Sequence, residues 1–244
     1  MSTIEDIIPN DICSPIIIDI GCGIGKSLYA ICKKCGSRSY IIGLDLDCLK
    51  LVKAKDLVQD IYVELICCDV TKLPIRNESI TTITMILTLH EVEESLINEL
   101  FKDLIRVLRI NGILFIIDKV LEKFNTKSEE LSVIVEEAYH KAKEYALGYR
   151  SWGIRRAKDI VNLVENFGFK LLDKNIIKFG KWLNGNEFLK HWGKETLQLC
   201  NMITDHRRKK ELLNIIKRIK LIASKHGYGP LTLLIAIFNK VRNM

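Results

Sequence analysis

Three glycines and two carboxylates stand close together near the start of the chain. Gly21, Gly23 and Gly25 follow Asp19, and Asp45 lies 20 residues beyond Gly25. Glycines at such a turn let the backbone bend tightly and approach a ligand without a Cβ clash. A helix that starts there adds free N–H groups, and an acid at the end of the next strand can bind ribose hydroxyls in a doubly wound nucleotide site. The pattern therefore predicts a site for a ligand that carries a ribose.

Two common nucleotide sites fit this turn poorly. The fingerprint of NAD and FAD sites is G-x-G-x-x-G, and here the third glycine comes one residue early, since Lys26 stands where it is needed. Gly25-Lys26-Ser27 resembles the end of a phosphate-binding P-loop, and 113–118 resembles a strand that holds magnesium. A P-loop also needs a glycine five residues before Gly25, but that position is Ile20. Both interpretations are disfavoured.

The turn lies in a segment where predicted strands and helices alternate up to residue 118. The run 16–20 is β-branched except for Asp19, which is typical of a buried parallel strand. In the predicted helix 47–57, Leu49, Val52 and Leu57 lie loosely on one face. The predicted strands are 16–20, 40–46, 62–68, 80–89 and 113–117, and the other predicted helices are 26–34 and 95–108. Such alternation predicts a parallel sheet with helices on both faces and a ligand at the carboxyl ends of the strands.

The pattern changes after Asp118. Polar helical segments are predicted at 128–145 and 187–225, a further helix at 156–166, and strands at 170–177 and 231–238. No repeat, low-complexity tract or Pro/Ser-rich linker divides the chain. We therefore expect one domain over 1–244, with an α/β, doubly wound, mostly parallel seven-stranded sheet and helical insertions at about 120–155 and 181–228.

Six segments, in order, resemble the class I S-adenosylmethionine-dependent methyltransferase family, a Rossmann-like fold. They are 17–25 (its first motif), 41–45 (its second strand), 68–75 (its adenine-contact segment), 87–92 (the exit of its fourth strand), 106–112 (the turn before strand five) and 167–169 (the turn into strand six). The subgroup that includes quinone-biosynthesis and many small-molecule methyltransferases is the most similar. Asn111 and Thr81 depart from the usual residues, away from the cofactor contacts.

The resemblance implies that S-adenosyl-L-methionine is the cofactor. The glycines would wrap its methionine part, and Asp19 would hold its amino group, directly or through water. Asp45 would accept hydrogen bonds from both ribose hydroxyls, although a helix N-cap is the alternative role for this residue. Asp69 would accept a hydrogen bond from the adenine amine. The full set of cofactor-binding residues that the resemblance implies is Asp19, Gly21, Gly23, Gly25, Asp45, Leu46, Asp69, Val70 and Leu87.

The sequence indicates the residues for catalysis and acceptor binding less clearly than those for the cofactor. The sulfonium is already reactive, so the protein must mainly align the acceptor and exclude water. By resemblance His90 lies near the methyl group, as a base or as a pocket-lining or structural histidine. Aromatic and basic residues of the insertions are candidates for the acceptor pocket, or for ordinary helix packing: Tyr149, Arg150, Trp152, Trp182, His191 and Trp192.

The eight cysteines carry no pattern of a small secreted domain. Cys32-x-x-Cys35 has no second matched pair, so we expect no metal site and free cysteines packed as small core residues. The start of the chain has Glu5 and Asp6 where a signal peptide is basic, and no stretch approaches the length of a membrane span. We expect a cytoplasmic protein with no membrane partner and reduced thiols.

The net charge of +7 permits an anionic partner without requiring one. A basic stretch at 206–210 continues in Lys217, Arg218 and Lys220, and it could track RNA phosphates. Apolar residues interleave with it at helical spacing, so an amphipathic surface helix also explains it. The leading prediction is a methyltransferase for a small-molecule acceptor; the alternatives are an RNA methyltransferase and a cofactor-binding regulator without catalysis. The sequence leaves the oligomeric state open.

Overall fold

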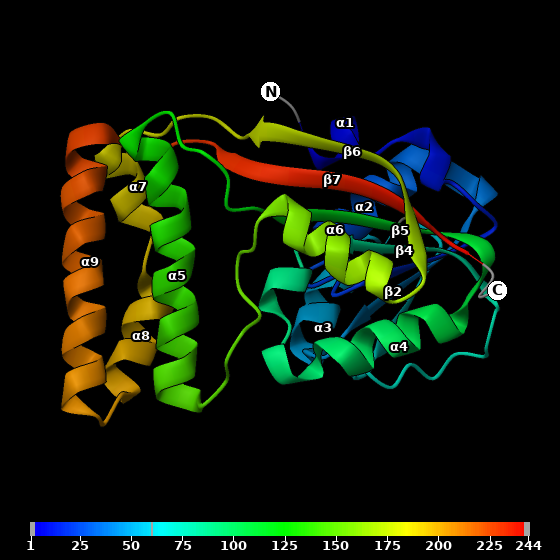
Figure 1. Ribbon diagram of the computed structural model, residues 1–244, viewed down its shortest axis with the longest axis horizontal. Coiled ribbons are helices and arrows are strands. Elements are labelled where there is room, and N and C mark those ends of the chain that lie inside the picture. Colours follow the sequence, from blue (N-terminus) through cyan, green and yellow to red (C-terminus); the bar gives the residue numbers. More distant parts are fainter. Residues whose placement is uncertain (1–2, 60, 242–244) are drawn as a thin grey trace.

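The computed structural model describes residues 3–59 and 61–241, and it forms one sheet with a helical bundle beyond its end (Figure 1). The described strands are β1 (Ile16–Ile20), β2 (Tyr40–Asp45), β3 (Val63–Cys67), β4 (Ile80–Ile86), β5 (Leu108–Lys119), β6 (Phe169–Phe179) and β7 (Leu231–Lys240). Their order in the sheet is β3-β2-β1-β4-β5-β7-β6, and β7 runs antiparallel to both of its neighbours. The predicted doubly wound, mostly parallel seven-stranded sheet is therefore confirmed.

Helices cover both faces of the sheet because successive β-branched residues of the buried strands point to opposite sides. On one face, Ile18 and Ile20 pack with residues of α4 (Ile97–Val107) and α6 (Ala157–Asn166). On the other face, Ile17 packs with residues of α1 (Ile4–Ile7), α2 (Lys26–Cys35) and α3 (Cys48–Leu57). The strand order reverses between β1 and β4, where the carboxyl ends of parallel strands leave a crevice.

The insertions gather into a bundle with its own core. It consists of α5 (Lys127–Leu147), α7 (Gly185–His191), α8 (Lys194–Met202) and α9 (His206–His226). Leu131 and Ala138 of α5 pack against Leu212 and Ile219 of α9. Figure 1 shows the bundle beyond the edge at which β6 ends, with α5 between α9 and the sheet. The insertions thus cover the carboxyl ends of the strands.

Several element boundaries differ from those predicted. Leu87 has φ +55°, outside the extended region, so β4 ends at Ile86 rather than at residue 89. The polar segment 187–225 forms α7, α8 and α9, because Gly193 in the left-handed region begins α8 and Asp205 caps α9. The predicted face of α3 is wrong as a packing face: Leu49, Val52 and Leu57 are exposed, while the helix buries Leu51 and Ala54.

Four cysteines form disulfides, which corrects the expectation of free thiols for these residues. Cys13 pairs with Cys35 and Cys48 with Cys67. In each case the fold joins residues that are about 20 positions apart, which no local spacing indicated. The remaining cysteines, Cys22, Cys32, Cys68 and Cys200, are free. Disulfides persist in oxidising compartments and also inside the cells of hyperthermophiles, so the cytoplasmic location stays a prediction.

Among the residues that the structure describes, no helix combines the length and the hydropathy that a membrane crossing requires.

Candidate functional site

The glycine turn forms the floor of a cavity at the reversal of strand order. After β1, the N–H groups of Gly21 and Cys22 both donate to the carbonyl oxygen of Leu44 at the end of β2. Gly21 has φ +69°, and a Cβ there would lie 2.3 Å from Cγ2 of Thr88. Gly23 has φ +54°, and a Cβ there would meet nothing within 4 Å. The turn is therefore closely packed at Gly21 and open to the cavity at Gly23.

Asp45 ends β2 and faces the same cavity. Its Oδ2 accepts the N–H of Gly23 at 2.7 Å, and its Oδ1 accepts the N–H of Asp47 at 2.9 Å. A carboxylate offers about four lone-pair positions, so about two remain for donors of a ligand. The N-cap of α3 is Asp47, whose side chain accepts the N–H groups of Leu49 and Lys50. The alternative role of Asp45 as that N-cap is thus excluded.

Asp69 follows β3 on the other side of the cavity. Its Oδ1 accepts both the N–H of Thr71 at 2.9 Å and the Thr71 hydroxyl at 2.7 Å. Both bonds hold the carboxylate through Oδ1, so they leave the acceptor capacity of Oδ2 unused. Val70, the next residue, is half-buried and lines the cavity beside Asp69.

The cavity has a volume of about 650 Å³ and contains most of the residues that the sequence indicated for cofactor binding. Those that line it are Gly21, Gly23, Asp45, Leu46, Asp69, Val70 and Leu87. Leu46 is an apolar side chain that is 71% exposed, as expected for the wall of a ligand site. Leu87 in the left-handed region is strained for a leucine, and such residues cluster at ligand sites.

Two of the residues indicated by sequence lie outside the lining. Gly25 begins α2, and a Cβ there would come within 3.1 Å of Ala54, so this glycine permits α2 to approach α3. Asp19 is fully buried beneath the turn, where its carboxylate accepts the hydroxyls of Ser27 at 2.6 Å and Thr84 at 2.7 Å. Burial raises the pKa of Asp19 to about 6, although both hydroxyls oppose the shift.

Helix α5 and the segment after it supply the opposite wall, which sequence reasoning largely missed. Tyr139 and Lys143 of α5, together with Tyr149, line the cavity. The Lys143 ammonium lies 4.2 Å from the centre of the Tyr149 ring and 3.1 Å from Oε2 of Glu91. Tyr149 in turn donates its hydroxyl to the carbonyl oxygen of Glu91. In the sequence, the only indication was that Tyr139 and Lys143 are four positions apart, which places them on the same face of a helix.

Of the aromatic and basic candidates for an acceptor pocket, only Tyr149 reaches this cavity. Arg150 and Trp152 line a separate hollow of about 420 Å³. Trp182 donates to the carbonyl oxygen of His226, and Trp192 stacks on Phe188 in the bundle. His191 is exposed at the end of α7. None of these five side chains lines the cavity.

His90 lies behind the cavity wall rather than in it. The imidazole is 2% exposed, and Nδ1 lies 2.5 Å from Oδ1 of Asp118, the acid near the end of β5. Burial opposes protonation, but the Asp118 carboxylate outweighs it and raises the pKa of His90. Glu91 is the residue of this pair that lines the cavity. Its burial favours the neutral form, yet the imidazoles and Lys143 around it hold the pKa of Glu91 below its usual range. The cavity therefore faces an ionised carboxylate.

A larger surface hollow of about 760 Å³ lies elsewhere, lined among others by Tyr29, Cys32, Ser39, Ile41 and Tyr62. Ser39 precedes β2 and Tyr62 precedes β3, so this hollow adjoins the amino ends of the strands. Ligands of open α/β sheets bind at the carboxyl ends. The cavity over the glycine turn is therefore the better candidate site.

Comparison with known proteins finds a described family that matches part of the chain. Residues 17–112 match a family described as a methyltransferase domain. Over 124 residues the chain is 31% identical to a carboxy-S-adenosyl-L-methionine synthase of Hydrogenovibrio crunogenus, which covers 49% of this chain and 47% of that protein. The chain thus spans about half the length of this curated relative.

Solved structures share the fold at low sequence identity. An S-adenosylmethionine-dependent methyltransferase from Methanosarcina mazei has a TM-score of 0.60 at 12% identity, covering 95% of this chain and 94% of the other. The 4+2 cyclase SpnF has a TM-score of 0.58 at 16% identity, covering 94% of this chain and 76% of the other. Likeness at this level establishes the fold, and one fold hosts several reactions.

Proposed function

Because residues 17–112 belong to the methyltransferase domain family and the chain has the class I S-adenosylmethionine-dependent methyltransferase fold, we propose that it binds S-adenosylmethionine and methylates a small acceptor. The observation that carries the proposal is the convergence of Gly23, Asp45 and Asp69 on one cavity. These residues come from the turns after three neighbouring strands. They are the chemical groups that a ligand with a ribose and a purine amine requires.

The polar groups of the cavity fit the cofactor one by one. Asp45 is held by two backbone N–H groups and keeps acceptor capacity for two adjacent hydroxyls. Asp69 is held through Oδ1 and can accept an amine through Oδ2. Gly23 leaves space for the methionine part, since a side chain at this position would project into the cavity. Asp19 would act from beneath the turn, through Ser27 or water rather than by direct contact.

The bound cofactor would supply an activated methyl group on sulfur, and the protein would position the acceptor. Tyr139, Lys143 and Tyr149 line the wall opposite the glycine turn, where they would limit access of water to the reacting atoms. A volume of about 650 Å³ must hold cofactor and acceptor together, which favours an acceptor of small size. Lys143, Tyr139 and the Glu91 carboxylate favour one with polar groups.

A second candidate is synthesis of a carboxylated cofactor. The observation in its favour is the 31% identity with a carboxy-S-adenosyl-L-methionine synthase over 124 residues, which is 49% of this chain. In that case the cofactor itself would be the acceptor. The bound products separate the two functions: the demethylated cofactor marks methyl transfer, and a carboxylated cofactor marks synthesis.

The basic stretch of α9 gives little support to an RNA acceptor. Helix α9 packs on α5 through Leu212, Ile216 and Ile219, as the amphipathic alternative predicted. Figure 1 places α9 on the side of α5 away from the sheet, whereas the cavity is lined by α5 and the strand ends. Arg218 is also paired with Glu130 of α5. An RNA bound along α9 would thus lie on the other side of α5 from the proposed position of the methyl group.

The decisive experiment is calorimetric titration with S-adenosylmethionine and with its demethylated product, followed by mass spectrometry of the cofactor after incubation with pooled small metabolites. We expect tight binding of both ligands and conversion only when an acceptor is present. Absence of binding would refute the proposal. Binding without conversion by any acceptor pool would favour the regulator, and salt-sensitive binding of bulk tRNA would favour the RNA methyltransferase.

A further inference from the structure

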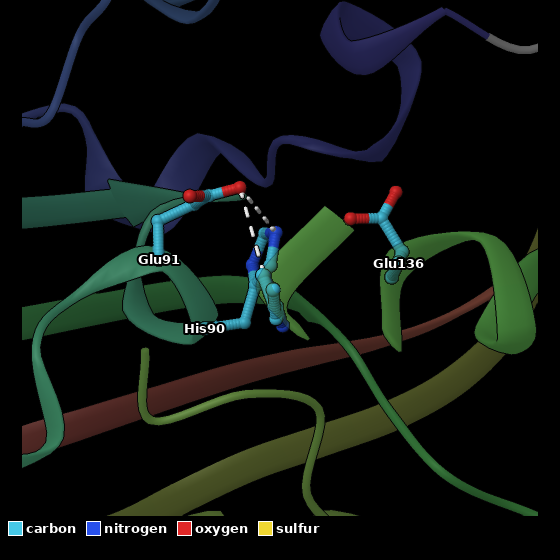
Figure 2. A group of neighbouring side chains, drawn as sticks. His90, Glu91 and Glu136 are labelled. Atoms are coloured by element: carbon cyan, nitrogen blue, oxygen red, sulfur yellow. Dashed lines mark ion pairs between the residues drawn. The ribbon is translucent and has the colours of Figure 1, made fainter. Parts of the chain in front are cut away.

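Two histidines and two glutamates meet beside the cavity, from segments that are distant in sequence. His90 and Glu91 come from the 3-10 turn Leu89–Glu91 after β4, and Glu136 and His140 lie one turn apart on α5. One nitrogen or oxygen atom from each residue lies within 4.8 Å of the others. Figure 2 shows the carboxylates of Glu91 and Glu136 on either side of the His90 ring. The cluster joins the sheet to the bundle.

His90 has the arrangement of a metal-binding histidine. Its Nδ1 faces the Asp118 carboxylate at 2.5 Å, and the backbone N–H of His90 donates to the other oxygen of Asp118 at 3.0 Å. A histidine that binds a metal nearly always gives its second ring nitrogen to such a carboxylate, which fixes the ring and makes it more basic. The atom left for a ligand is Nε2, and it is the atom that faces the cluster.

Glu91 lies between the two imidazoles at distances that suit a shared ion. Its Oε1 is 3.7 Å from Nε2 of His90 and 3.8 Å from Nε2 of His140. These separations are too long for hydrogen bonds. Ligands that bind one tetrahedral zinc ion at 2.0–2.2 Å lie about 3.4 Å from each other, so a small inward movement would bring the three atoms to bonding distance.

His140 supplies an independent observation. Its Nε2 is buried and has no hydrogen-bond partner among the described residues. A buried polar nitrogen without a partner loses about 1–3 kcal/mol relative to a paired one, and it is uncommon in folded proteins. The same nitrogen points to Oε1 of Glu91. A cation between these atoms would satisfy it.

The nature of the donors selects the class of ion. Imidazole suits zinc, iron, copper and nickel, whereas magnesium and calcium prefer oxygen atoms alone. The negative charge of the two carboxylates is shared with lysines, since Lys119 bonds to Glu136 at 2.5 Å and Lys143 to Glu91 at 3.1 Å. Each lysine bonds to one oxygen of its carboxylate, and the other oxygen of Glu136 and of Glu91 remains as a possible metal ligand.

We propose that His90, Glu91, Glu136 and His140 bind one divalent transition-metal ion of the zinc class. The site goes beyond methyl transfer and does not depend on it, because none of its residues belongs to the glycine turn or the strand ends that would hold the cofactor. Since Glu91 also lines the cavity, the ion would stand next to the acceptor chamber. An acceptor with an oxygen or nitrogen donor would be the class that it orients.

The test is titration of chelator-treated full-length protein with Zn²⁺ by calorimetry, and with Co²⁺ by visible absorption. We expect one Zn²⁺ per chain and a Co²⁺ spectrum typical of nitrogen and oxygen ligands. His140→Ala should weaken Zn²⁺ binding at least about 100-fold, more than loss of an outer-shell partner does. The matched control is His206→Ala, because His206 is exposed at the start of α9 and lies outside the cluster.

Glu136→Gln provides a second variant that keeps the shape of the side chain, in case His140→Ala fails to fold; it should also weaken Zn²⁺ binding. Circular dichroism and the thermal midpoint of the chelated variants report folding separately. Three results would overturn the proposal: no stoichiometric Zn²⁺ uptake by the folded wild-type protein, equal losses in His140→Ala and His206→Ala, or a thiolate charge-transfer band with Co²⁺, which would assign the ion to the free cysteines. Cofactor titration in the chelated protein tests the proposed function independently.

Discussion

The backbone N–H of Gly23 donates to Oδ2 of Asp45 at 2.7 Å, so the glycine turn and the end of β2 are fixed to each other at the floor of the cavity. This bond links the turn that would receive the methionine part to the acid that would receive the ribose. It also orients the carboxylate, because Oδ1 is held at the same time by the N–H of Asp47. These two bonds fix the Asp45 carboxylate relative to the glycine turn.

Asp45→Ala should weaken S-adenosylmethionine binding by about 10- to 100-fold. A hydrogen bond to a charged group contributes about 1.5–3 kcal/mol, and the substitution also releases the N–H of Gly23. Calorimetric titration measures the dissociation constant. Asp56→Ala, an exposed substitution on α3 outside the cavity, is the control and should bind normally. Unchanged affinity in Asp45→Ala would move the ribose contact elsewhere.

Gly23→Ala and Gly36→Ala form a matched pair that separates strain from ligand contact. Both glycines have positive φ, and at both a Cβ would meet nothing within 4 Å. Gly23→Ala should cost about 1–2 kcal/mol of unfolding free energy, because alanine disfavours a positive φ, and Gly36→Ala should cost somewhat more, because Gly36 combines φ +61° with ψ −153°, a region that glycine alone adopts readily. Only Gly23 lines the cavity, so only Gly23→Ala should also weaken cofactor binding. Equal affinities of the two variants for S-adenosylmethionine, measured on folded protein, would contradict the proposed position of the methionine part.

The sequence was sufficient to predict the sheet and to indicate most of the residues that line one end of the cavity, where we propose that the cofactor binds. Apolar runs mark the strands, Asp45 ends the second run, and Asp69 follows the predicted strand 62–68, so their convergence follows from parallel strands. The glycine turn marks the same edge. Each of these features depends on residues that are close together in the sequence, so long-range packing does not change it.

The opposite wall could not be predicted in the same way. Tyr139, Lys143, Glu136 and His140 lie on a helix whose position depends on the packing of α5 against α9 and on the path of the insertion. His90 was placed near the methyl group by resemblance, but its bond to Asp118 draws the ring behind the wall and leaves Glu91 in front. Pairings over long sequence distances decide these features, as they decide the disulfides.

Asp19 should make stability fall as the pH rises through about 6. Its pKa is raised from 3.8 to about 6 in the folded protein, so the folded state keeps a proton that the unfolded state loses near pH 4. The favourable contribution is complete below pH 4 and is lost above pH 6, a difference of about 3 kcal/mol. Asp19→Asn lacks this ionisation. The unfolding free energy of Asp19→Asn relative to that of the wild-type protein should therefore rise by about 2–2.5 kcal/mol between pH 4 and pH 7, since part of the loss already occurs below pH 4.

A matched control for that comparison is Asp173→Asn, since Asp173 is exposed on β6. The same pH series for this variant reports the effect of a carboxylate-to-amide change at an exposed site. A difference between Asp19→Asn and the wild-type protein that does not change with pH would show that the carboxylate of Asp19 is not stabilised in its neutral form by burial.

Asp118→Ala should destabilise the protein by about 3–5 kcal/mol, the usual cost of removing one partner of a buried ionic pair. The Asp118 carboxylate is hydrogen-bonded to the imidazole of His90. It also accepts hydrogen bonds from the backbone N–H groups of His90, at 3.0 Å, and Lys119, at 2.7 Å. All three donors would be left unsatisfied. Urea unfolding in the presence of a chelator measures this loss without any contribution from a bound ion, and the exposed substitution Asp173→Ala should change stability by less than about 0.5 kcal/mol.

The double variant His90→Phe, Asp118→Leu tests the cause of that loss. If the penalty of Asp118→Ala arises from an uncompensated buried imidazole, replacing both partners with apolar groups of similar size should recover much of the stability, because no buried charge remains. The two backbone N–H groups would still lack an acceptor, so the recovery should be incomplete. A double variant less stable than Asp118→Ala would instead show that Asp118 acts mainly by accepting hydrogen bonds from the backbone near the end of β5. The imidazole of His90 would then contribute little to stability.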